Sequence, residues 1–190
     1  SSVSYVESRS QTIDQSSYDG AGGTVDFRYL PSGCSVLMQA GAVVTLGTSD
    51  PGFAQEVMVH FFGRTGDGVA TVEILNQSLS TVFASQSIDL DGAGATRLAF
   101  TGLSGAIVKI RITLAGGPGV MTGAACLKPY GFVPLAMGIG GSIFDQNNHG
   151  SQEMFDLLCD DYEVKLFFVQ AKDETADSTD FRDALDRLQG

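Results

Sequence analysis

The chain has 190 residues, with 22 Asp and Glu against 11 Lys and Arg, and a formal net charge of −11. Its length fits one domain with a small addition, and 43% hydrophobic residues with 12 Phe are enough for a real core. Because an acidic chain repels phosphate backbones, the charge argues against direct nucleic-acid binding. No apolar run reaches the length of a membrane span.

Residues 1–24 read as a polar N-terminal arm rich in serine. Its main apolar points include Tyr5 and Ile13, which are candidate contacts for a partner protein. A free arm of this composition is poorly ordered unless something holds it. We expect the holder to be the arm's own domain or a neighbouring subunit.

Residues 25–133 contain short apolar segments separated by glycine-rich turns, and the chain as a whole holds 24 Gly. The expected strands are 25–30, 36–38, 43–46, 56–62, 69–75, 80–84, 87–90, 96–101, 106–114 and 120–127. No helix of ten or more residues interrupts them, which argues against βαβ units. The pattern predicts a mainly β protein whose body is an antiparallel, jelly-roll-like β-sandwich.

Two segments indicate where the core lies. In 106–114 apolar residues alternate with Lys109, Arg111 and Thr113, so one face of that strand is expected to point inward and the other outward. In 56–62 both alternating sets after Glu56 are apolar except for His60, which favours a central strand with little solvent on either face.

Residues 134–150 form a connector rich in Gly and Asn, and 151–190 form an acidic α/β appendage with 11 Asp and Glu against 4 Lys and Arg. Ser151 is placed to cap a helix through about Cys159, and 164–169 is a short apolar strand. A last helix begins at Asp177 or Ser178. Its apolar stripe consists of Phe181, Ala184, Leu185 and Leu188. This stripe is either a second candidate contact for a partner protein or a face that folds back on the sandwich.

The two histidines do not predict a catalytic centre. His60 lies within an apolar strand, so we expect a packed or hydrogen-bonded core residue. Asp145, His149 and Glu153 have a spacing that could bind a metal on a helix, but the Asn-Asn-His-Gly sequence favours a loop, which removes that geometry. No metal or cofactor is expected there.

Two carboxylate pairs are also candidates. Asp89 and Asp91 could hold calcium, which takes several oxygen ligands, but a plain Asp-Gly turn is the simpler explanation and is preferred. Asp160 and Asp161 are expected in a solvated loop or helix end. Neither pair has the neighbours that acid–base catalysis needs, and no nucleophile or phosphate-binding motif is present. We expect no enzyme activity; a hydrolase with an unrecognised site is the third hypothesis.

The three cysteines, Cys34, Cys126 and Cys159, form no Cys-x-x-Cys pair. Their apolar settings favour buried free thiols. A Cys34–Cys126 bridge between the first and last strands is the alternative.

The segments VATVEIL, SQSIDLDG, LAFTGLSG and IVKIRITL, within residues 69–114, resemble galactose-binding-like jelly-roll modules. Similar arrangements occur in bacterial and phage surface proteins, and the arm and sandwich together resemble a tailed-phage virion protein. The resemblance covers about a quarter of the chain and carries over no sugar or calcium ligand.

This resemblance implies a structural protein of a virion, either a capsid decoration or a tail or neck component. Such a protein would contact other subunits and itself as a homo-oligomer, without membrane or nucleic acid. The alternative is a carbohydrate-binding sandwich of a secreted or cell-surface protein, which would present an aromatic residue beside Asp or Asn.

Overall fold

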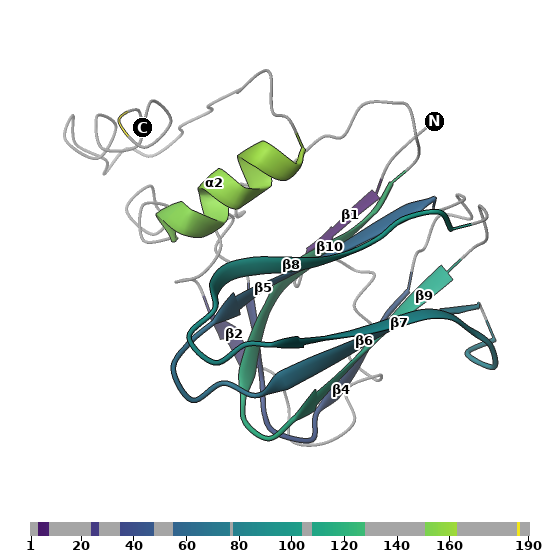
Figure 1. Cartoon of the computed structure of the whole chain (residues 1–190), viewed down its shortest axis with the longest axis horizontal. Coiled ribbons are helices and arrows are strands. Elements are labelled where there is room, and N and C mark those ends of the chain that lie inside the picture. The colour runs from purple at the N-terminus through teal and green to yellow at the C-terminus, as the bar shows by residue number, and fades with distance from the viewer. Residues whose placement is uncertain are drawn as a thin grey trace, which may run out of the picture.

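The computed structural model of the chain describes residues 4–7, 24–26, 35–47, 55–76, 78–103, 108–127, 151–162 and 186. Within these residues two antiparallel sheets face each other, and one helix lies over the outer face of the larger sheet (Figure 1). The mainly β sandwich expected from the sequence is therefore confirmed.

The larger sheet has six strands. They are β1 (Ser4–Glu7), β2 (Thr24–Asp26), β3 (Ser35–Met38), β5 (Glu56–Gly63), β8 (Gly94–Phe100) and β10 (Gly119–Leu127). Their order is β2-β3-β10-β5-β8, and β1 pairs with β10 beyond the stretch that pairs with β3. All pairings are antiparallel.

The smaller sheet has the order β4-β9-β6-β7. Its strands are β4 (Val43–Gly47), β6 (Val69–Asn76), β7 (Val82–Asp89) and β9 (Val108–Ala115). Each pair is antiparallel. Chain neighbours β6 and β7 form a hairpin, whereas β9 reaches the sheet from the other layer.

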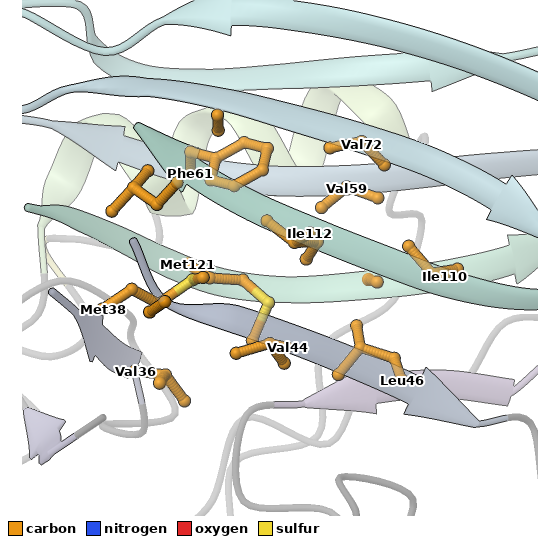
Figure 2. Close-up of a cluster of buried hydrophobic side chains, with 14 of the residues drawn as sticks. Val36, Met38, Val44, Leu46, Val59, Phe61, Val72, Ile110, Ile112 and Met121 are labelled. Atoms are coloured by element: carbon orange, nitrogen blue, oxygen red, sulfur yellow. The ribbon is translucent and has the colours of Figure 1, made fainter. Parts of the chain in front are cut away.

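The core lies between the two sheets (Figure 2). Phe61 on β5, Ile112 on β9 and Met121 on β10 are each at most 1% exposed and come from both layers. Strands β6 and β9 alternate as expected, with apolar side chains buried and polar ones on the outer face. The period-two pattern is confirmed because only one face of each of these strands meets the other sheet.

Strands β5 and β10 differ because they are apolar or buried on both faces. Eight of the nine residues of β10 are buried, and β5 lies between β10 and β8 as the sequence predicted. Their outer faces need a cover, which the helix supplies.

Helix α2 (Gln152–Asp161) begins where the sequence predicted. The Ser151 hydroxyl accepts a hydrogen bond from the Met154 amide at 3.4 Å, which satisfies one of the free amides of the first turn. Met154 and Leu158 face the sheet and are buried against Phe62 and Ala95. Within the described part of the chain, no helix is long and apolar enough to cross a bilayer.

Three local expectations need correction or extension. The predicted strands 80–84 and 87–90 form one continuous strand, β7, because Ser85 and Gln86 stay paired with β6. Of the first predicted strand, 25–30, the structure describes only residues 25 and 26, which belong to β2; residues 27–30 lie outside the described residues. Residues 4–7 of the expected arm form strand β1 in the larger sheet, with Tyr5 opposite Ala125. The arm is therefore held in part by its own domain.

The predicted strand at 164–169, the last helix and the connector at 134–150 lie outside the described residues. The division of the chain at residues 25, 134 and 151 stays a prediction.

Neighbouring residues of β9 provide a test of the two-layer core. Ile112 is fully buried and Thr113 lies on the outer face of the smaller sheet. We expect Ile112→Ala to lower the free energy of unfolding by about 2–5 kcal/mol, because it leaves a cavity. Thr113→Ala should change it by less than about 0.5 kcal/mol. Urea unfolding measures both, and equal losses would contradict the assigned faces.

Candidate functional site: one covered and one open face

The outer face of the larger sheet carries a buried charged cluster beneath α2. Asp161, at the end of the helix, lies 2.8 Å from His60 Nε2 and 2.8 Å from Arg97 Nη1. The His60 and Asp161 side chains are 0% and 1% exposed, whereas Arg97 is 41% exposed. His60 and Arg97 are direct cross-strand partners on β5 and β8, so one carboxylate bridges both strands to the helix.

The expectation for His60 is confirmed, since it is buried and hydrogen-bonded. The expectation that Asp161 is solvated is wrong. Asp160, its neighbour, is exposed, but Asp161 lies one helical position further round and points at the sheet. Because a carboxylate only accepts, the His60 Nε2 atom carries the proton of this bond.

A histidine and a carboxylate 2.8 Å apart also occur in catalytic triads, so the third member has to be sought. Within the described residues His60 Nδ1 has no hydrogen-bond partner, and neither has the buried Ser35 hydroxyl. Ser35 lies on β3, which is separated from β5 by β10. Two strand spacings place the backbones about 10 Å apart, too far for a serine to reach the imidazole. The His60, Asp161 and Arg97 cluster, called the clasp below, therefore joins α2 to the larger sheet, and Ser35 does not complete a triad with it.

The outer face of the smaller sheet is different, because no helix or strand among the described residues lies over it (Figure 1). Two adjacent rows of cross-strand partners run across its four strands. They are Val43, Thr113, Thr71 and Ser87 in one row, and Thr45, Arg111, Glu73 and Ser85 in the next. We call these eight residues the polar grid; seven of them carry a hydroxyl or a charge.

Two side-chain bonds order the polar grid. The Thr71 and Ser87 hydroxyl oxygens are 2.8 Å apart, and Arg111 Nε donates to a Glu73 carboxylate oxygen at 2.7 Å. The hydrogen bond from Arg111 lowers the pKa of Glu73 and raises the pKa of Arg111. Both side chains therefore stay ionised in each other's presence.

A short exposed apolar segment lies beside the polar grid. Val82 and Phe83, at the start of β7, are 47% and 45% exposed. The β6–β7 turn before them holds Leu79 at a φ of 61°, with the Asn76 side chain accepting from the amides of Ser80 and Thr81. Sequence analysis did not single out Phe83, although its place in a segment that also holds Ser80, Ser85 and Gln86 was a signal that this strand is exposed.

The calcium hypothesis for Asp89 and Asp91 gains no support. Asp89 accepts from the Asp91 amide, and Asp91 accepts from the Gly66 amide at 2.7 Å. These bonds use the carboxylates to close the β7–β8 turn against the β5–β6 loop, as the simpler alternative predicted. Among the described residues no group of three metal-ligating side chains is found.

Two of the cysteines are described, and both are free thiols. Cys126 lies on β10 between β1 and β5, and burial raises its pKa to about 12. The alternative of a bridge from Cys126 is therefore wrong. Burial and the nearby Asp156 and Asp160 raise the pKa of Cys159. A thiol with a raised pKa is a poor nucleophile at neutral pH.

The candidate partner contacts are mostly outside the described residues, including Ile13, Phe181, Ala184, Leu185 and Leu188. Tyr5 is described only through its backbone, which pairs with β10. His149 and Asp145 also lie outside the described residues, whereas Glu153 on α2 accepts from the Ala95 amide at 3.4 Å.

Neither a protein-family model nor a curated relative matches this sequence. Among solved structures the chain is similar to the C-terminal family 6 carbohydrate-binding module of the laminarinase LamC from Zobellia galactanivorans, at 13% identity and a TM-score of 0.46 over 66% of this chain and 99% of that one. It is also similar to a family 6 module from Clostridium stercorarium in complex with cellobiose, at 18% identity and a TM-score of 0.44 over 64% and 90% of the two chains.

A third similar structure is a family 36 module in complex with calcium and xylotriose, at 12% identity and a TM-score of 0.42 over 64% and 97% of the two chains. At these identities and scores a ligand has to be argued from the residues of this chain alone. None of the three is described as a virion protein.

The clasp predicts different effects for two adjacent carboxylates. Asp161→Ala should lower the free energy of unfolding by about 2–4 kcal/mol, because it leaves the buried His60 without its acceptor. Asp160→Ala removes an exposed carboxylate and should change stability by less than about 0.5 kcal/mol. Guanidinium unfolding measures both, and hydrogen exchange should show α2 opening first in Asp161→Ala. Equal behaviour of the two variants would show that Asp161 does not hold the helix.

Proposed function

We propose that this protein is a non-catalytic carbohydrate-binding module and that the polar grid is its binding face. The observation that carries the proposal is the two rows of polar side chains on the outer face of the smaller sheet. Arg111 and Glu73, on its two central strands, are joined by a hydrogen bond. A glycan-binding role implies an extracellular or cell-surface setting.

The dimensions of the polar grid suit a short oligosaccharide. Three strand spacings and one two-residue step give a surface of roughly 14 Å by 7 Å. The side chains project from strands, so the sheet determines their spacing before any ligand binds. Pre-positioned donors and acceptors reduce the entropy lost on binding.

The Arg111–Glu73 pair provides the chemistry that a sugar diol requires. Adjacent hydroxyls on a pyranose ring each donate and accept, so a fixed cation beside a fixed carboxylate can bind both at once. Glu73 uses one carboxylate oxygen for Arg111 Nε, which leaves its second oxygen and the Arg111 terminal amines for a ligand. The exposed Phe83 ring on the adjoining strand offers an apolar surface for a sugar ring.

The charge of the polar grid favours a neutral glycan. Arg111 and Glu73 cancel, while the whole chain carries −11 and repels acidic polymers. Cleavage of a glycan would need two carboxyl groups about 5–9.5 Å apart. Among the described residues, the next carboxylate on this face is Asp89, which pairs with Val69, four residues along β6 from Glu73 and thus about 13 Å away. This separation supports the proposal of binding rather than hydrolysis.

The virion role expected from the sequence resemblance has no support in the described contacts, so the alternative reading becomes the proposal. A role of Tyr5, Ile13 and the apolar stripe in binding another protein stays a prediction.

A glycan array probed with the full chain tests the proposal. We expect binding to neutral oligosaccharides, and Arg111→Ala should weaken the affinity for each bound glycan by about 10- to 100-fold, because it removes charged hydrogen bonds. Isothermal titration calorimetry measures the affinity. The matched control is Thr101→Ala, an exposed side chain outside the grid, which should bind normally. An array without a single bound glycan would contradict the proposal.

The pH dependence of binding follows from Glu73. Its pKa is lowered from the ordinary value of 4.5, so its carboxylate stays ionised until the pH falls below that value. We expect glycan affinity to be constant between about pH 5 and pH 8 and to fall only as Glu73 becomes protonated below about pH 4.5. Glu73→Gln should bind more weakly at neutral pH and lose this acid-side decrease. A decrease centred near pH 6 to 7 would contradict the assignment.

A further inference from the structure

Strand β7 is the longest sheet edge among the described strands. The sheet edges among these strands are β1, β2, β8, β4 and β7, and β7 has eight residues. Edge strands expose unpaired backbone groups that readily pair with another strand. Native proteins usually guard such edges with charges, prolines or a covering element.

The two longest edge strands, β7 and β8, differ in the features that hinder pairing with another strand. Strand β8 has α2 lying over it, with Glu153 on the Ala95 amide and Asp161 on Arg97. Strand β7 holds no Lys, Arg or Pro, and its one charged residue, Asp89, is its last. Ser85, Gln86 and Ser87 in its centre are exposed.

The centre of β7 is chemically symmetric about Gln86. Reading outward, Ser85 matches Ser87, and the apolar Ala84 matches the apolar Ile88. Ser85 and Ser87 lie on the outer face, since Ser87 bonds Thr71 there, whereas Ala84 and Ile88 pack against the core. A strand with this symmetry is complementary to an antiparallel copy of itself.

We propose that the protein forms a twofold homodimer in which β7 pairs with β7 of a second copy, with the two Gln86 residues directly opposite. In this register Ser85 faces Ser87 of the second copy, Ala84 faces Ile88, and Phe83 faces Asp89. Inner-face residues meet inner-face residues, as a continuous sheet requires. No two carboxylates face each other, although each chain carries −11.

The dimer would join the two four-stranded sheets into one sheet of eight strands. The row that ends at Ser87 would continue into Ser85, Glu73 and Arg111 of the second copy, so two polar grids would become one surface. The inference rests on the edge of β7 and stands whether or not that surface binds glycan. If it does, two linked sites would raise the apparent affinity for a polymer.

The side-chain contact that Gln86 makes in the single chain is weak enough to be replaced in the dimer. Its Nε2 lies 3.5 Å from the Ala99 carbonyl oxygen across the sandwich edge, which is a long hydrogen bond. In the dimer the same amide would bond the Gln86 amide of the second copy.

Sedimentation velocity of the full chain over a series of concentrations tests the dimer. We expect the wild type to reach twice the monomer mass. Gln86→Lys and Gln86→Glu should each weaken the dimer by at least about tenfold, because they place like charges opposite each other. An equimolar mixture of the two variants should form a heterodimer of full strength. Thr101→Lys, which adds the same charge outside β7, should leave the dimer intact.

Three results would overturn the proposal: a wild-type chain that stays monomeric at every concentration, a dimer that both Gln86 variants retain, or a mixture that does not recover. Circular dichroism confirms that the variants are folded. Gln86→Cys provides an independent readout, because two directly opposite cysteines are close enough to oxidise to a bridge. Mass spectrometry should locate that bridge at position 86, with Thr101→Cys uncrosslinked; the reverse result would also overturn the register.

Discussion

Strand β10 is buried on both of its faces, and the rest of the structure depends on this double burial. Its inner residues, such as Met121, fill the space between the sheets, while Thr122 and Ala125 are equally excluded from water on the other side. A sheet in a two-layer sandwich normally shows one face to solvent. Here the outer face of the larger sheet needs a third layer, and α2 supplies it with Met154 and Leu158.

The clasp at the end of α2 follows from the same requirement. Beneath a cover, the polar His60 cannot hydrate, so it needs a partner from the covering element. Asp161 provides the carboxylate, and the partly exposed Arg97 balances its charge. A histidine–carboxylate pair also occurs in catalytic sites, but here both side chains are at most 1% exposed beneath the helix.

Among the described residues, α2 covers the larger sheet and no element covers the outer face of the smaller sheet. The outer face of the smaller sheet carries a set of hydroxyls and one ion pair, and among the described strands its edge strand β7 pairs only with β6. Face and edge meet at Ser85 and Ser87, which belong to the polar grid and to the proposed dimer contact. Binding and assembly would therefore share one continuous surface.

Alternation of residue type was sufficient to predict most strands and the helix cap. The pattern around Ile110 and Ile112 settles which side of β9 is buried, and a serine before an apolar turn indicates where α2 begins, because both signals are local. The same locality explains the failures. Ser85 and Gln86 interrupt the apolar pattern but not the pairing with β6, so one strand was predicted as two. Glu73 and Arg111 are 38 residues apart, and no local pattern could reveal their contact.

The sequence by itself determined the mainly β class, the inward faces of the strands and the start of α2, since each depends on residues within a few positions of one another. Only the tertiary structure decided that Asp161 is buried against His60, that residues 4–7 join the larger sheet and that no described element covers the outer face of the smaller sheet. These features depend on which distant segments meet, and the free energy of burying both faces of β10 determines that choice.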